Sequence, residues 1–239
     1  MLKALACGQV PPLKMLLDRG LRLDVSEGWH AENALLCSAA QGGVPMLEFL
    51  FNSGFQVVPE RNDSLAVHTA INRPDINALQ FLLVKKKIGL PASEALVSAV
   101  ESIPEKNKST EATQRMLDIL LDHGLDINAS KDDDSGQTCL WGAIQREDSS
   151  FLRLLLDRSA SPMLRDRQGD TPLYAAAAKG FLEGVRIILE WATLHTQNAE
   201  IITRPELRAQ ISNAVLQAAA QESWKIVRIL ERYDYTGYL

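Results

Sequence analysis

The 239-residue sequence is poor in several features that would define a chemical class. Its three cysteines, Cys7, Cys37 and Cys139, are odd in number and far apart, so they form neither a disulfide framework nor a zinc-binding pair. We interpret them as buried thiols of a protein in a reducing compartment. No apolar run approaches the roughly 18 residues that a membrane span needs. Aromatic residues make up only 6% of the chain, which suits helices that stack through small side chains.

Positive charge is also scarce. Lysine and arginine total 25 against 30 acidic residues, giving a formal net charge of −5, and the only basic run is Lys85, Lys86 and Lys87. A nucleic-acid binder needs a basic face, so we expect no nucleic-acid partner. The first residues lack the apolar region of a secretory signal. We therefore expect no membrane association and a location in the cytoplasm or the nucleus.

The chain is organised around residues 166–189, which read as a turn followed by two short helices. Thr171 fits a helix N-cap, and Pro172 fits the first helical position, where its missing N–H costs nothing. Four alanines follow, and Gly180 ends this first helix. The second helix has apolar residues at three- and four-residue spacing, namely Leu182, Val185, Ile188 and Leu189. Neither helix can bury its apolar face within the unit, so the unit requires copies of itself on either side.

A copy precedes this stretch at a fixed distance. The run that starts at Thr138 repeats the pattern of the run at Thr171, 33 residues later, and each is followed at the same distance by an aliphatic run. A 33-residue period with a Thr-Pro-Leu-His-like turn and two helices resembles the ankyrin repeat, with Tyr174 where the family usually has histidine. The resemblance implies an all-α ankyrin-repeat solenoid of paired antiparallel helices with short turn fingers.

The same pattern divides the rest of the chain into one array spanning residues 1–239. A partial repeat occupies residues 1–25, and about six full repeats follow, starting near positions 33, 65, 94, 138, 171 and 213. Two inserts interrupt the period, at about residues 101–113 and 191–210. We expect the first insert to be an exposed loop and the second to extend a helix or form an extra turn. An array that starts within a repeat suggests a segment of a larger regulatory chain.

The resemblance implies a scaffold that binds another protein through its fingers and first-helix surface. The sequence has no metal-ligand spacing, Gly-rich phosphate loop or Gly-x-Ser-x-Gly motif, so we expect no cofactor, metal or catalytic residue, and we expect a monomer. Carried over position by position, the candidate partner-binding residues lie in the fingers or at the ends of the first helices. They are Trp29, His30, Arg61, Asn62, Asn72, Arg73, Asp134, Gln137, Arg146, Arg167, Gln168 and Lys179. The acidic finger at residues 132–134 suggests a partner with a basic patch.

Two alternatives stay open beside the scaffold. The array could be a structural spacer whose groove binds nothing. It could also hold a small-ligand or catalytic site at the two inserts, built with His123 or His195. A calcium loop beginning at Asp132 is excluded, because its twelfth position falls on Ala143 instead of a glutamate.

Overall fold

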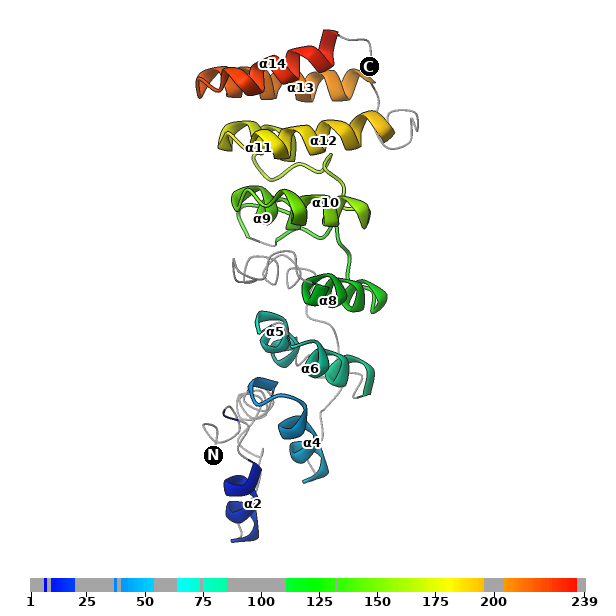
Figure 1. Cartoon of the computed structure of the whole chain (residues 1–239), viewed down its shortest axis with the longest axis vertical. Helices are drawn as coiled ribbons and strands as arrows, with labels where there is room; N and C mark the ends of the chain where they lie inside the picture. Colours follow the sequence, from blue (N-terminus) through cyan, green and yellow to red (C-terminus); the bar gives the residue numbers. More distant parts are fainter. Residues whose placement is uncertain are drawn as a thin grey trace. The chain divides into compact units, whose positions relative to one another are not determined.

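The computed structural model of the chain describes residues 7, 10–19, 37, 40–53, 64–73, 75–85, 111–131, 133–195 and 204–235. These residues belong to two units. Unit 1 comprises Met1–Ala95 and Ser102–Leu125, and unit 2 comprises Leu96–Glu101 and Asp126–Leu239. Regular structure in the described residues is helical, apart from one isolated antiparallel bridge between Ser130 and Thr138 (Figure 1).

Unit 1 is built from short helices. They are α2 (Val10–Asp18), α4 (Val44–Asn52), α5 (Ser64–Asn72), α6 (Ile76–Gln80), the π-helical turn η1 (Phe81–Lys85) and α8 (Glu111–Asp122). Helix α6 lies at the centre, in contact with α4, α5 and α8. Its core consists of aliphatic side chains that water cannot reach, among them Met46, Leu47, Leu50, Ile71, Leu79, Leu82 and Leu120.

Unit 2 contains three successive helix pairs. They are α9 (Cys139–Gln145) with α10 (Ser149–Asp157), α11 (Pro172–Lys179) with α12 (Leu182–His195), and α13 (Arg204–Ala220) with α14 (Trp224–Tyr235) (Figure 1). The first helices stack α9 on α11 and α11 on α13, while the second helices stack α10 on α12 and α12 on α14. Each pair thus buries its apolar side against the next, as the sequence pattern requires.

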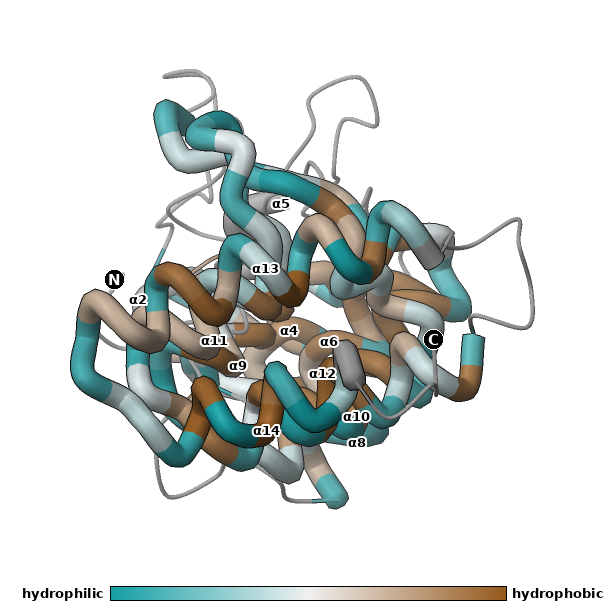
Figure 2. The backbone as a smooth tube through the Cα atoms, turned by 90° about the horizontal axis from the view of Figure 1, so that it is seen from above, coloured by the Kyte–Doolittle hydropathy of each residue, from teal (hydrophilic) through white to brown (hydrophobic). Residues whose placement is uncertain are grey.

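Buried alanines are characteristic of the first helices of unit 2. Beside larger core residues such as Leu140, Leu173 and Ile211, these helices bury Ala143, Ala176, Ala177, Ala214 and Ala218, which allow helix backbones to approach closely. The second helices bury larger aliphatic residues, including Leu152, Leu155, Ile188, Leu189, Ile226 and Leu230. Figure 2 shows hydrophobic and hydrophilic residues alternating along α14, as expected for a helix that is buried on one side only.

Helix α11 starts and stops where the sequence predicts. The Thr171 side-chain oxygen accepts a hydrogen bond from the Tyr174 N–H at 3.3 Å, and Pro172 is the first helical residue. Gly180 then takes the left-handed conformation, with φ 78° and ψ 13°. The Phe181 N–H closes the turn on the Ala176 carbonyl at 2.9 Å.

The same turn follows the first helix in all three pairs of unit 2. The closing bond runs from Asp148 N–H to the Ala143 carbonyl at 3.0 Å and from Ser223 N–H to the Ala218 carbonyl at 2.8 Å. The position that Gly180 fills is occupied there by glutamates with positive φ, 54° at Glu147 and 55° at Glu222. These two turns therefore carry backbone strain that the glycine turn avoids.

Asn128 connects neighbouring repeats within unit 2. Its side-chain oxygen accepts a hydrogen bond from the Ser161 N–H at 2.7 Å, and its amide nitrogen lies 3.4 Å from the Ser159 carbonyl, which accepts from it. One side chain thus satisfies two backbone groups that lie about one repeat further along the chain.

Two sequence expectations need correction. Cys7 lies in a turn before α2 and is exposed, and Cys37 is half-buried, so only Cys139, inside α9, is the buried thiol that we expected for all three. Burial raises the pKa of the Cys139 thiol to about 12. The first insert is not a loop up to residue 113, because α8 begins at Glu111 and Thr113 is fully buried. Thr113 lies on the face of α8 that also carries buried apolar residues three and four positions further on.

The second insert divides between two helices. Residues 191–195 extend α12, as one of our two alternatives predicted, and residues 204–210 belong to α13, which begins well before the expected repeat start at Asn213. Residues 101–110 and 196–203 lie outside the described part of the chain. The repeat boundaries stay predictions.

The left-handed turn predicts opposite effects of exchanging its residues. Gly180→Ala should lower the free energy of unfolding by about 1 kcal/mol, since a Cβ is strained at positive φ. Glu147→Gly should raise the free energy of unfolding by about 0.5 kcal/mol. Glycine removes the strain of a Cβ at positive φ, and this gain exceeds the stability lost because glycine makes the unfolded chain more flexible. Urea denaturation would measure both. Gly180→Asn is the control and should lose less than Gly180→Ala, while equal losses would contradict the argument.

Asn128→Ala should destabilise the protein by about 1 kcal/mol, because the half-buried Ser161 N–H and the exposed Ser159 carbonyl lose their partner. Asn128→Asp keeps an acceptor for the shorter of the two bonds and should lose less. Thermal unfolding of both variants checks the prediction, and equal stability of Asn128→Ala and wild type would refute it.

Candidate protein-binding surface

The loop between residues 130 and 138 forms the first finger of unit 2. The Ser130–Thr138 bridge closes its base, where the Lys131 N–H donates to the Gln137 carbonyl at 2.9 Å. At the tip, the Asp133 carboxylate accepts from the Ser135 hydroxyl and backbone N–H and from the Gly136 N–H. The Ser135 hydrogen bonds lower the pKa of Asp133 below its usual value. This carboxylate therefore holds the loop in shape.

A second finger spans residues 164–171 and is built in the same way. The Asp166 carboxylate accepts from the Gln168 N–H at 3.0 Å and from the Asp170 N–H at 2.9 Å. The Arg165 guanidinium donates to the Gly169 carbonyl at 2.7 Å. Local hydrogen bonds thus fix this finger too, without any regular strand pairing.

The two fingers contact each other directly. The Arg167 N–H donates to the Ser135 carbonyl at 3.0 Å. Gly136, with φ 62°, allows this approach, because a Cβ at that position would lie 2.7 Å from the Arg167 Cγ. Replacing this glycine would strain the backbone and push the fingers apart.

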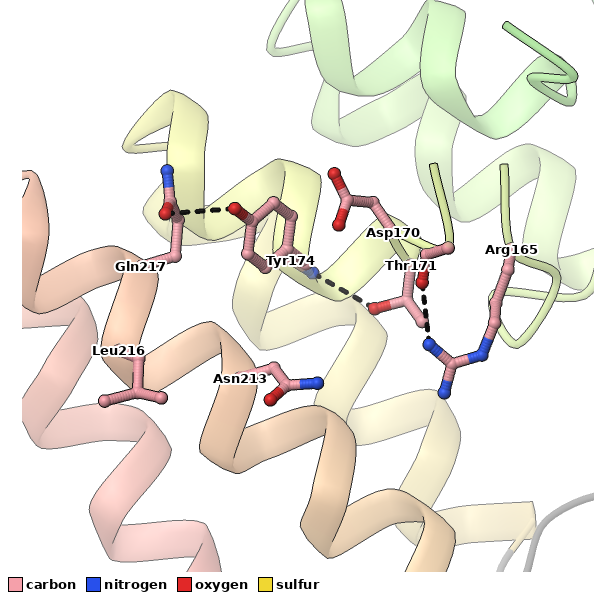
Figure 3. Close-up of a pocket in the computed structure, with 8 residues that line it drawn as sticks. Arg165, Asp170, Thr171, Tyr174, Asn213, Leu216 and Gln217 are labelled. Atoms are coloured by element: carbon pink, nitrogen blue, oxygen red, sulfur yellow. Dashed lines mark hydrogen bonds between the residues drawn. The ribbon is translucent and has the colours of Figure 1, made fainter. Parts of the chain in front are cut away.

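A groove of about 310 Å³ lies between the second finger and the first helices α11 and α13 (Figure 3). Finger and helix residues line it together, namely Arg165, Gly169, Asp170, Thr171, Tyr174, Asn213, Leu216 and Gln217. On one side the Tyr174 hydroxyl donates to the Gln217 side-chain oxygen at 3.0 Å, linking α11 to α13 (Figure 3).

Leu216 is the apolar part of this groove. Relative to the turn that ends each first helix, Leu216 in α13 occupies the position of Tyr174 in α11 and Trp141 in α9. Trp141 is only 2% exposed, whereas Leu216 is 71% exposed. The same repeat position is therefore core in one helix and accessible surface in another.

Asp170 is the half-buried acid of the groove. Burial is the main cause that raises its pKa above the usual value, and repulsion from the Asp166 carboxylate adds to it. The positive charge of Arg165 opposes both effects. Ionised Asp170 is thus held in an environment that disfavours its charge.

The structure distributes the predicted binding residues as follows. Trp29, His30, Arg61 and Asn62 lie outside the described residues, and Asn72 is described only through its backbone at the end of α5. In unit 1, Arg73 is exposed just after α5. In unit 2, Asp134 and Gln137 belong to the first finger, Arg167 and Gln168 to the second, and Arg146 and Lys179 lie at the ends of α9 and α11.

The groove itself is lined by residues that we did not select from the sequence. Arg167 and Gln168 belong to its finger, but the lining side chains are neighbours such as Arg165 and Asp170. The repeat register gave the position of Leu216, yet its exposure depends on which helices surround α13. The spacing of residues in the sequence does not show which helices surround α13.

Both histidines considered for a catalytic site lie at helix ends. The His123 Nδ1 is 2.8 Å from the Ile119 carbonyl, and the His195 Nδ1 is 2.7 Å from the Trp191 carbonyl. The His195 ring also stacks on the Trp191 indole, with ring centroids 4.1 Å apart. Neither histidine lines the groove between the second finger and α13.

A family model for ankyrin repeats, in three copies, matches residues 106–204. The ankyrin repeat domain of Bcl-3, described as a unique member of the IkappaB protein family, has a similar structure. Its TM-score is 0.61 at 22% sequence identity, with 94% of this chain and 96% of that chain covered. Residues 106–204 therefore match three ankyrin repeats. The chain has the all-α fold of that family, and ankyrin repeats are generally modules for binding other proteins.

A human protein also shares this ankyrin-like sequence. Transient receptor potential cation channel subfamily A member 1 of Homo sapiens is 24% identical over 167 residues. The match covers 69% of this chain but only 14% of that protein. In the described residues, no helix has the length and apolar character to cross a membrane, and no group of three or more His, Cys, Asp or Glu could hold a metal ion.

The environment of Asp170 predicts a pH-dependent stability difference. Because the pKa of Asp170 is raised in the folded state, ionisation of this side chain lowers the free energy of unfolding. The loss begins as the pH rises past the ordinary carboxyl pKa and is complete above the raised pKa. Asp170→Asn should therefore be slightly more stable than wild type at pH 7, and this gain should vanish in acid, below the ordinary carboxyl pKa. Urea denaturation over a pH series measures it. Asp134→Asn, at an exposed finger residue, is the control, and a gain for Asp170→Asn that persists in acid would contradict the electrostatic cause.

Proposed function

We propose that this chain is a scaffold that binds a partner protein through the fingers and first-helix surface of unit 2. The groove between the second finger, α11 and α13 is the observation that carries this proposal. It is open to solvent, about 310 Å³ in volume, and lined by side chains from three separate segments. A groove of this size accommodates one or two side chains of a partner.

The rigidity of the fingers supports this role. Asp133 and Asp166 each accept several local hydrogen bonds, and the Arg167 N–H ties the second finger to the first at Ser135. Loops that are ordered before binding lose little conformational entropy when a partner docks. The binding surface is therefore formed in advance by the repeats themselves.

The mixed chemistry of the groove also supports it. Leu216 offers an accessible apolar contact beside the amides of Asn213 and Gln217. Partner surfaces commonly combine an apolar anchor with surrounding polar groups that set orientation. Such a lining suits a segment of protein better than a compact small molecule.

The remaining finger and helix-end residues extend this surface in our proposal. In unit 2 these are Asp134, Gln137, Arg146, Arg167, Gln168 and Lys179, and in unit 1 we assign the corresponding role to Arg73. We also propose that the array serves as a module of a larger regulatory chain. The much longer human channel subunit, in which a similar segment is a small part of the length, supports this view.

A capture experiment tests the assignment of the binding surface. The groove variant carries Arg167→Ala, Asn213→Ala and Leu216→Ala, and the control carries Arg186→Ala, Arg228→Ala and Glu231→Ala on the second helices α12 and α14. Quantitative mass spectrometry of proteins retained from a cell lysate should show a set bound by wild type and the control and reduced at least about tenfold by the groove variant.

Circular dichroism must show equal folding of all three proteins. If wild type and the groove variant retain the same proteins in the same amounts, the groove is not the binding surface. If the second-helix control alone loses the retained set, binding occurs through α12 and α14 instead.

A further inference from the structure

Asp170 differs from the other finger acids in what its carboxylate contacts. Asp133 and Asp166 use their carboxylates to accept backbone hydrogen bonds inside their own fingers. Asp170 lies in the second finger as well, but its hydrogen bonds run through its backbone, with the N–H donating to Asp166 and the carbonyl accepting from the Asp166 N–H. Its carboxylate accepts no hydrogen bond from any residue that the structure describes.

Arg165, the positive group nearest in the groove, does not neutralise this carboxylate directly. Its guanidinium is engaged with the Gly169 carbonyl at 2.7 Å. Figure 3 shows the Asp170 carboxylate directed towards Tyr174 and apart from the Arg165 guanidinium. The groove therefore presents a half-buried negative charge to which no described residue donates a hydrogen bond.

The rest of the lining fits a long cationic side chain. Leu216, 71% exposed, offers an apolar surface along which methylene groups can pack. The Tyr174 hydroxyl donates to Gln217, so its oxygen can still accept a hydrogen bond, and Asn213 adds an exposed amide oxygen. An exposed apolar side chain and two hydrogen-bond acceptors thus line the same groove as the Asp170 carboxylate.

On the premise that the proposed scaffold function holds, we propose that this groove takes a lysine or arginine side chain of the partner protein. The ammonium or guanidinium group contacts the Asp170 carboxylate, and the aliphatic stem lies over Leu216. A charged donor and a carboxylate that are both shielded from water form a strong hydrogen bond with high specificity. The partner therefore supplies a basic residue in an exposed, extended segment.

Other ligand chemistries fit the groove less well. An acidic side chain would face the negative charges of Asp170 and Asp166 together, with Arg165 as the one positive group among the lining residues. An apolar side chain would complete the burial of Asp170 without supplying a donor, which is costly for an ionised group. The raised pKa of Asp170 agrees with a site whose charge awaits a partner. Retaining a residue that costs stability is typical of a functional position.

Selection from a random peptide library displayed on phage tests the proposal with a defined probe. Peptides selected on the intact chain should be enriched in lysine and arginine. Labelled synthetic copies, measured by fluorescence anisotropy, should bind Asp170→Asn at least about tenfold more weakly than wild type. The control Asp157→Asn, at the exposed end of the second helix α10, should bind them about as well as wild type. Replacing the enriched basic residue of the peptide by norleucine should cause a similar loss, and should cause no further loss on Asp170→Asn.

The outcomes separate this inference from the proposed function. Selected peptides without basic enrichment, or with equal affinity for Asp170→Asn, overturn the cationic ligand. If those peptides still lose affinity for the variant Arg167→Ala, Asn213→Ala, Leu216→Ala, the groove remains the binding surface and only the ligand chemistry is wrong. If that variant binds them as wild type does, or if no peptide is selected, the proposed groove function fails as well.

Discussion

The stacking of α9 on α11 and of α11 on α13 supports the remaining features of unit 2. Buried alanines at this contact bring the first helices close together, and each helix gains the apolar neighbour that its own repeat cannot provide. Because the first helices stack in order, the loops that precede them also lie in order. This is why the Arg167 N–H can bond the Ser135 carbonyl across two fingers, and why finger and helix residues meet in one groove.

The turn that ends each first helix shows how this packing dominates local preference. Three turns have the same closing hydrogen bond, but only one of them has glycine at the left-handed position. Glu147 and Glu222 adopt that conformation because the helices on either side are held by their neighbours. In a repeat array, contacts between repeats can thus maintain a turn whose own residue disfavours it.

The acidic residues of the proposed binding surface have two different roles. The carboxylates of Asp133 and Asp166 accept hydrogen bonds within their own fingers and order them. Asp170 instead faces the groove, where its ionised form destabilises the fold. Leu216 is exposed at a repeat position that is core in α9. Leu216 thus differs from its repeat equivalent in exposure, and Asp170 differs from the other finger acids in its contacts. Both residues line the same groove. Departures from a repeated pattern are expected where a repeat protein acquires specificity.

The sequence by itself determined the fold class, the 33-residue spacing, and the start and end of α11, because these follow from residues that act locally: the Thr171 cap, Pro172 and Gly180. In unit 2 it also predicted the loops that precede α9 and α11. Tertiary structure decided that Cys7 is exposed and Thr113 buried, how the second insert divides between α12 and α13, and which side chains line the groove. The exposure of a side chain, and whether a described residue donates a hydrogen bond to Asp170, depend on atoms contributed by other segments, which the spacing of residues along one chain cannot specify.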